Sequence, residues 1–142
     1  MPVNQRTTSR RRARFTAVLG LVACTLLIAV VASHERNARY RRYSAYKADV
    51  AHREIAEIVR AVERYRQDVG TFPTANAGLP TLLTPTPQPV GWHGPYLRRI
   101  PVDPWQRPYR YVYPGAHNKE SFDIVSAGPD GVVDTPDDLG NW

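Results

Sequence analysis

The feature that most constrains the fold is a long stretch, residues 21–69, that contains neither proline nor glycine. These two residue types are the least favourable in a helix interior, so their absence permits one uninterrupted helix of about 75 Å at 1.5 Å per residue. Apolar and aromatic residues recur there at intervals of mostly three and four, the period of a helix with one buried stripe. They are Tyr43, Tyr46, Val50, Ile55, Ile58, Val59, Val62, Tyr65 and Val69. Gly70 and Pro73 then predict the helix end.

The beginning of this stretch overlaps an apolar run, residues 15–32, that contains no charged side chain. Its length lies at the short end of the roughly 17–25 residues that cross a bilayer, which favours a membrane helix. Two other interpretations remain open. The Ala-Ser-His that ends the run loosely resembles a signal-peptide cleavage site, and residues 21–24 (LVAC) resemble a lipoprotein signal. The only cysteine, Cys24, lies inside the run, so the chain forms no internal disulfide.

The net charge of +6 is located mainly before the apolar run. Once those five arginines are set aside, the remaining Lys and Arg nearly balance the 13 Asp and Glu, so we predict no nucleic-acid partner. By the positive-inside rule the basic leader is cytoplasmic and the C-terminal part lies outside. The margin is narrow, because four arginines also follow the run. The preceding arginines are Arg6, Arg10, Arg11, Arg12 and Arg14, and the following ones are Arg36, Arg39, Arg41 and Arg42.

After the helix, residues 71–108 hold most of the chain's 13 prolines, which excludes long helices and central strands. A short helical turn is still expected within residues 77–83. Trp92, Tyr96 and Trp105 need to be buried, which favours a fixed loop over a disordered one. Residues 109–113 and 122–126 are predicted strands separated by a turn. A lone hairpin is marginal in water, so we expect it to pack on the helix in an α+β fold.

Four aspartates, Asp130, Asp134, Asp137 and Asp138, are crowded among glycines and prolines near the end of the chain. Carboxylates this close repel one another unless a cation lies between them. Calcium fits because it takes six to eight oxygen ligands in flexible geometry. From spacing alone, a surface turn with solvated acids explains the pattern equally well.

We find no arrangement of residues that predicts catalysis. The four histidines are scattered, and no Ser-His-Asp set or histidine pair at metal spacing occurs. Asp103 lies between Pro101 and Pro104 and directly precedes the latter. Because Asp-Pro commonly starts a turn, Asp103 is interpreted as the start of a turn. Trp92 and Trp105 are expected to close the loop over the helix rather than to bind a ligand. We therefore predict that the protein is not an enzyme.

Several motifs in a fixed order resemble the type IV pilin and pseudopilin family, and in particular the major pseudopilins of type II secretion systems. The resemblance covers residues 65–142, about half of the chain. The motifs are residues 65–74 (YRQDVGTFPT), 78–79 (GL), 92–97 (WHGPYL), 101–109 (PVDPWQRPY) and 126–138 (SAGPDGVVDTPDD).

The resemblance implies a type IV pilin-like α+β fold, in which a long N-terminal helix packs against a small antiparallel sheet, with a Pro-rich loop and a C-terminal calcium loop. The implied divisions are a basic cytoplasmic leader at 1–14, a transmembrane helix at 15–33, its amphipathic continuation at 34–69, and a periplasmic head at 70–142 with its calcium loop at 126–139. For Ca²⁺, the resemblance implies the carboxylates of Asp130, Asp137 and Asp138 and the carbonyls of Ala127 and Val132. Asp134, where the family often has glycine, is a further possible ligand.

The function implied is that of a calcium-stabilised, single-pass inner-membrane subunit that assembles through its helix into a periplasmic pseudopilus. Its partners would be further copies, other pseudopilins, the inner-membrane secretion platform and the lipid bilayer. The family begins its apolar run with Gly-Phe-Thr-Leu-Ile-Glu, but here Arg14 replaces the glycine and Leu19 replaces the glutamate. These departures leave an alternative: an uncleaved, membrane-anchored periplasmic calcium-binding accessory protein that does not polymerise.

Overall fold

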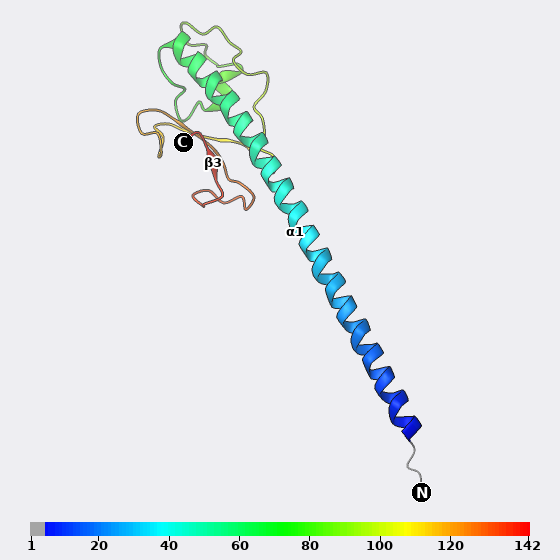
Figure 1. Ribbon diagram of the computed structural model, residues 1–142. Helices are drawn as coiled ribbons and strands as arrows, with labels where there is room; N and C mark the ends of the chain where they lie inside the picture. Colours follow the sequence, from blue (N-terminus) through cyan, green and yellow to red (C-terminus); the bar gives the residue numbers. More distant parts are fainter. Residues whose placement is uncertain (1–4) are drawn as a thin grey trace. The chain divides into compact units, whose positions relative to one another are not determined.

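The computed structural model describes the backbone of residues 5–142, and the side chains from residue 21 onward except residue 23. The chain divides into two compact units, residues 1–43 and 44–142. Its elements are the helix α1 (Gln5–Val69), the short 3₁₀ helix η1 (Leu79–Leu82), and the strands β1 (Arg110–Val112), β2 (Asp123–Ser126) and β3 (Leu139–Gly140) (Figure 1).

Helix α1 ends where the sequence predicts and begins earlier. Gly70 adopts a left-handed φ of 86°, and its N–H donates to the Arg66 carbonyl at 2.8 Å, which closes the last turn. At the other end the helix passes through Gly20, because one glycine costs only about 1 kcal/mol relative to alanine.

The predicted membrane segment at residues 15–33 lies partly outside the residues whose side chains are described. Within the described residues, no helical stretch combines the length and the apolar character that crossing a membrane requires. Two hydroxyl groups among the described side chains of this region are bonded to the helix itself. Thr25 Oγ1 donates to the Val22 carbonyl at 2.8 Å, and Ser33 Oγ donates to the Val30 carbonyl at 2.7 Å.

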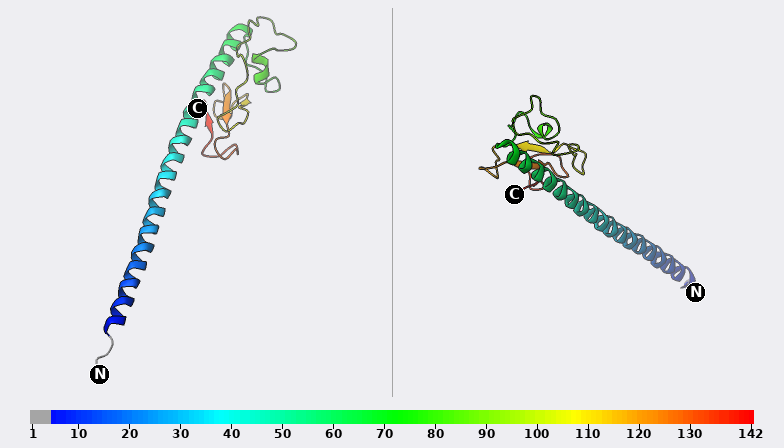
Figure 2. Two further views of the ribbon diagram at one scale, coloured as in Figure 1. Left: turned by 90° about the vertical axis from the view of Figure 1, so that its right-hand side faces the viewer. Right: turned by 90° about the horizontal axis from the view of Figure 1, so that it is seen from above.

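The sheet is antiparallel with the order β1-β2-β3. Tyr111 pairs with Ile124, and Ser126 pairs with Leu139. In Figure 2 the strands lie alongside the C-terminal part of α1. The two strands predicted from the sequence are confirmed, and so is the helical turn at η1. The two-residue strand β3 is too short to leave an alternating pattern, so the sequence does not predict it.

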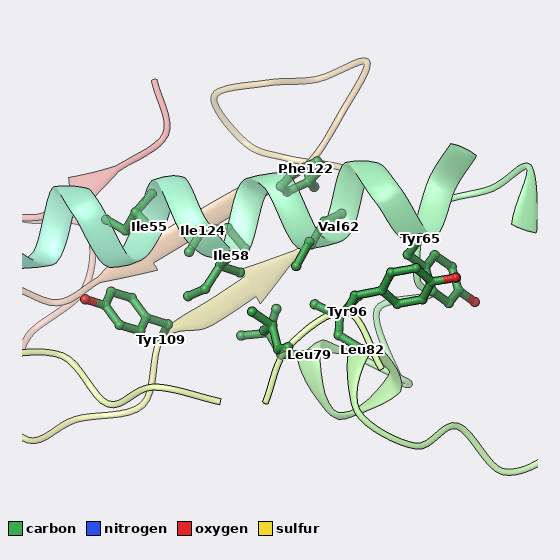
Figure 3. Close-up of a cluster of buried hydrophobic side chains, with 12 residues drawn as sticks. Ile55, Ile58, Val62, Tyr65, Leu79, Leu82, Tyr96, Tyr109, Phe122 and Ile124 are labelled. Carbon is green, nitrogen blue, oxygen red and sulfur yellow. The ribbon is translucent and has the colours of Figure 1, made fainter. Parts of the chain in front are cut away.

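The core of the second unit forms between α1 and the sheet. Ile58 and Val62 are fully buried and belong to the same cluster as Ile124 and Phe122 of the hairpin, together with Leu82 of η1 (Figure 3). The spacing of the helix residues is the predicted one. The full cluster consists of Ile55, Ile58, Ala61, Val62, Tyr65, Leu79, Leu82, Tyr96, Leu97, Tyr109, Phe122 and Ile124.

Two members of the predicted buried stripe are exposed. Tyr43 is 59% exposed and Tyr46 is 61% exposed, so their placement on the buried face was wrong. The reason is that helical periodicity continues along the helix, whereas the buried hydrophobic residues of the described part begin at Ala51.

The Pro-rich segment is held in place by Tyr96, as expected for a fixed loop. The Tyr96 ring makes edge-to-face contacts with Tyr65 and Trp92, each at a centroid distance of 5.8 Å. Its hydroxyl donates to Asp68 Oδ2 at 2.8 Å, and its N–H donates to the Leu82 carbonyl at 2.8 Å. Trp92 therefore closes the loop over the end of α1, as predicted from the sequence.

Candidate metal site in the C-terminal loop

The segment between β2 and β3, here called the C-terminal loop (residues 126–139), is anchored at its start by a buried carboxylate. Ser126 Oγ donates to Asp103 Oδ2 at 2.6 Å, and both residues are fully buried. The other oxygen, Asp103 Oδ1, accepts the N–H of Trp105 at 3.0 Å and of Arg107 at 2.8 Å. Asp103 thus starts the predicted turn and also ties that turn to the loop, a second role that the sequence does not reveal.

Arg107 brings a positive charge to the first part of the C-terminal loop. Its Nη1 donates to the Gly128 carbonyl at 2.6 Å. The guanidinium lies so close to Gly131 that a Cβ there would collide with it. Sequence reasoning missed this contact, because nothing local connects Arg107 with residues 21 positions further along.

The end of the C-terminal loop is fastened to β2 by a side-chain amide. Asn141 Oδ1 accepts the N–H of Ile124 at 2.8 Å, and Asn141 Nδ2 donates to the Phe122 carbonyl at 3.0 Å. Because the start is held by Asp103 of the Pro-rich segment, both ends of the loop are bonded to other parts of the head.

Two of the predicted ligands, Asp130 and Asp137, are joined by a hydrogen bond from the backbone of one to the carboxylate of the other. Asp137 Oδ2 accepts the N–H of Asp130 at 3.1 Å, and Asp137 Oδ1 accepts the Thr135 hydroxyl at 2.6 Å. The Thr135 bond, followed by the Asp130 bond, lowers the pKa of Asp137 and keeps it ionised. Asp130 Oδ1 accepts the N–H of Val132 at 2.8 Å.

The third predicted ligand, Asp138, has one satisfied and one unsatisfied oxygen. Its Oδ2 accepts the N–H of Asp134 at 2.7 Å. Its Oδ1 is buried and has no hydrogen-bond partner among the described residues. A buried acceptor without a donor is costly, and a cation would satisfy it.

The structure also shows the conformation of Asp134 and the hydrogen bonds of the two predicted carbonyl ligands, Ala127 and Val132. Asp134 has a φ of 66°, a left-handed conformation that glycine adopts most easily and that aspartate tolerates. The Ala127 carbonyl accepts the N–H of Gly131 at 3.0 Å, and the Val132 carbonyl accepts the Thr135 hydroxyl at 3.1 Å. A carbonyl has a second lone pair, so each could still face a cation.

The chemistry of the predicted ligands suits calcium, because every ligand atom is an oxygen and one buried carboxylate oxygen lacks a hydrogen-bond partner. However, the predicted ligands do not form a preassembled coordination site. Within the part of the chain that the structure describes, no three His, Cys, Asp or Glu side chains could together hold a metal ion. The loop's own N–H and hydroxyl groups instead bond to four of these carboxylate oxygens: Asp130 Oδ1, both oxygens of Asp137, and Asp138 Oδ2. The calcium ligand set therefore stays a prediction.

Next to the C-terminal loop, His117 and Trp142 border a hollow of about 400 Å³ into which Asp134 and Asp138 also project. The rings of His117 and Trp142 stack at a centroid distance of 3.8 Å and an angle of 11°. His117 Nδ1 lies 3.6 Å from Asp123 Oδ2. A stacked aromatic pair, which the sequence did not indicate, therefore lies beside the aspartates of the loop.

Asp123, at the start of β2, is a second buried carboxylate that sequence reasoning missed. Its oxygens accept the N–H of His117 at 2.8 Å, the N–H of Asn118 at 3.0 Å and the Asn118 side-chain amide at 2.8 Å. Burial by itself raises the pKa of Asp123, but these hydrogen bonds together outweigh burial and lower it. Asp123 thus holds the turn between β1 and β2 in place.

Comparison with known proteins shows to which family this chain belongs. A family model described as "Type II secretion system (T2SS), protein G" matches residues 40–142. The chain belongs to this protein G family. The type II secretion system core protein G of Pseudomonas aeruginosa is 33% identical over 140 residues, which cover 94% of this chain and 96% of that protein. The protein of the same name from Pectobacterium carotovorum is 35% identical over 129 residues, 88% of this chain and 76% of that protein.

A solved structure of the same family has the same fold. The major pseudopilin of the type 2 secretion system of enterohaemorrhagic Escherichia coli matches with a TM-score of 0.63 and 33% identity, over 71% of this chain and 87% of that one. The pseudopilin resemblance seen in the sequence is confirmed, as is the fold of one long helix packed on a small antiparallel sheet. This member of the protein G family is a structural pseudopilin subunit of a type II secretion system. Its relatives are named as secretion-system components and not as enzymes.

Proposed function

We propose that this pseudopilin assembles with further copies and with other pseudopilins into a periplasmic pseudopilus, and that the helix of its first unit holds it in the inner membrane. The observation that carries the proposal is the head fold, shared with a solved major pseudopilin over most of that protein's length. The secretion platform of the inner membrane is the expected docking partner.

The character of the helix in the first unit supports a lipid environment. Leu21, Leu26 and Leu27 are each more than 60% exposed, and so is Ile28. In a bilayer every polar group needs an internal partner. The hydroxyls of Thr25 and Ser33 meet this requirement by bonding to carbonyls of their own helix.

The native N-terminus distinguishes filament assembly from static anchoring. In the family that the sequence resembles, the leader is cleaved after the glycine position, which is Arg14 here. If this chain is processed in the same way, mass spectrometry of the protein purified from its native membrane should give a mature chain that begins with a methylated Phe15. A chain that keeps its arginine leader would contradict processing. That result would favour the uncleaved accessory protein that does not polymerise.

We also propose that Ca²⁺ stabilises the head by binding in the C-terminal loop. The side chains of Asp130, Asp137 and Asp138 would hold it, with the carbonyls of Ala127 and Val132. The support is the buried, unpartnered Oδ1 of Asp138 together with the crowding of carboxylates on one loop. The ion would neutralise that crowding and brace the connection between β2 and β3.

Thermal unfolding with calcium and with a chelator tests this proposal. Calcium at a hundred times its Kd should add about 2.7 kcal/mol to the free energy of unfolding. Asp138→Asn should abolish the difference, whereas Glu120→Gln, an exposed residue outside the loop, should keep it. An unchanged melting temperature on chelation would refute calcium binding and leave the pseudopilin assignment intact.

A further inference from the structure

Four arginines on α1, here called the basic belt, follow the apolar run directly: Arg36, Arg39, Arg41 and Arg42. All four side chains are exposed and belong to the first unit. The sequence contains no acidic residue from 36 to 48. Among the described side chains, none of the four guanidinium groups forms an ion pair with a carboxylate. The positive charge of the belt is therefore available to an external anion.

The arginines point back toward the apolar run. Every Cα–Cβ bond in an α-helix tilts toward the N-terminus, so long side chains cover the preceding turn. Arg36 shows this directly, because its Nε donates to the Ala32 carbonyl at 3.3 Å. At 1.5 Å per residue, the Cα atoms of Arg36 and Arg42 lie about 8 and 17 Å beyond Val31 along the helix axis.

These distances match the level of lipid headgroups. The polar layer of each leaflet is about 5–8 Å thick outside the hydrocarbon core. If Val31 marks the edge of that core, the back-tilted guanidinium groups of Arg36 and Arg39 lie within this layer. Those of Arg41 and Arg42 lie at its outer edge.

An exposed aromatic side chain and a small hollow accompany the belt. Tyr40 is 68% exposed, and tyrosine is typical of membrane–water interfaces. The hollow, of about 400 Å³, is lined by His34, Asn37, Ala38 and Arg41. These residues lie on one face of the helix, and the small Ala38 leaves room between the polar side chains. The hollow offers hydrogen-bond donors beside a guanidinium group, which suits a phosphate ester.

We propose that the basic belt binds the phosphate headgroups of anionic phospholipids and so fixes the depth of α1 in the bilayer. This inference rests on the proposed membrane location of the first unit. A second copy of the chain is the other candidate occupant. Lipid is favoured because four like charges at the same height on neighbouring copies would repel one another. The belt also continues directly from the apolar residues that lipid tails would contact.

Native mass spectrometry of the full chain in a neutral detergent provides the test, with equal amounts of phosphatidylglycerol and phosphatidylcholine added. We expect phosphatidylglycerol adducts to exceed phosphatidylcholine adducts by about tenfold or more, because each arginine near an anionic surface contributes favourably. A variant with Arg36, Arg39, Arg41 and Arg42 all changed to Gln should bind the two lipids about equally. The matched control changes Arg53, Arg60, Arg98 and Arg99 to Gln. These four are exposed residues of the second unit, so the control loses the same charge and should keep the preference.

Three outcomes would overturn the belt proposal: equal binding by the unsubstituted chain, a preference that survives in the belt variant, or lipid-free dimers that disappear in that variant. The last outcome would assign the belt to a second copy. Flotation with vesicles of pure phosphatidylcholine tests the membrane location separately. A chain that floats without any preference for phosphatidylglycerol refutes the belt alone, whereas one that does not float refutes the membrane anchor.

Discussion

Asp103 shows how much one buried side chain contributes to this head. Its carboxylate accepts three hydrogen bonds, from Ser126 Oγ and from the N–H groups of Trp105 and Arg107, and the residue is fully buried. Through them it joins the Pro-rich segment to the start of the C-terminal loop.

We expect Asp103→Ala to lower the free energy of unfolding by about 2–4 kcal/mol, because hydrogen bonds to charged groups are worth about 1.5–3 kcal/mol each and the buried Ser126 hydroxyl loses its acceptor. Chemical denaturation of the folded head measures this loss. The control is Glu120→Ala at an exposed site, which should stay within about 0.5 kcal/mol of the original protein. An equal, small effect of both substitutions would contradict the anchoring role.

Asp123 makes stability depend on pH. Its pKa in the folded state is lowered below the ordinary value of 3.8, so its stabilising contribution is complete above the unfolded-state pKa and is lost as pH falls through the folded-state value. The stability of the protein should therefore fall on acidification below about pH 5.

Asp123→Asn should be less stable at neutral pH and should show a flatter acid limb in denaturation curves recorded from pH 7 to pH 2.5. Because His117 lies 3.6 Å from Asp123, the comparison should be repeated with His117→Gln in both proteins. If the acid limb keeps its full slope in Asp123→Asn, other carboxylates cause the acid sensitivity.

At the scale of elements, the sequence predicts the features that depend only on neighbouring residues in the chain. The helix end at Val69 follows from Gly70, and strands β1 and β2 follow from alternating β-branched and aromatic residues. The exposure of Tyr46 could not be predicted, since it depends on where the sheet covers the helix. Strand β3 forms only because β2 offers it an edge.

The same distinction applies to the candidate site. The sequence identifies the crowded aspartates, because they are neighbours along the chain. It does not identify Arg107 against Gly128, Asn141 against β2, or His117 on Trp142, since each contact joins residues that are distant in sequence. Nor does spacing reveal that the loop's own N–H groups bond to carboxylate oxygens of Asp130, Asp137 and Asp138.

Arg107 should hold the first part of the C-terminal loop closed. Arg107→Gln removes the charged donor of the 2.6 Å bond to the Gly128 carbonyl. We expect the Gly131 N–H, which is bonded to Ala127, to exchange with deuterium about five- to tenfold faster under calcium-free conditions. Arg110→Gln, an exposed substitution on β1, is the matched loss of charge and should leave this exchange rate unchanged. Unchanged exchange in Arg107→Gln would show that other contacts close the loop.

At the scale of the whole molecule, the second unit contains a core of its own. Every residue of the buried hydrophobic cluster lies at or beyond Ile55. A fragment of residues 44–142 should therefore unfold in one cooperative transition, with a melting temperature within a few degrees of that of the head in the full chain.

Calorimetry of the fragment and of the detergent-solubilised chain checks this expectation. The control is the fragment with Ile58→Ala, which should lose about 2–5 kcal/mol because Ile58 is fully buried between helix and sheet. A broad, uncooperative melt of the unsubstituted fragment would mean that the head needs residues before 44.

The strands of the head are very short: three residues in β1 and two in β3, the strands at the two edges of the sheet. An exposed strand edge is a template on which a neighbouring chain can add its own strand, and long, flat edges are the usual starting points of aggregation. Here each edge offers only a few unpaired backbone groups, and β1 carries the exposed charge of Arg110. Many such heads could be crowded together without their sheets fusing, so that reversible side-chain contacts, and not shared β-structure, would decide how copies associate.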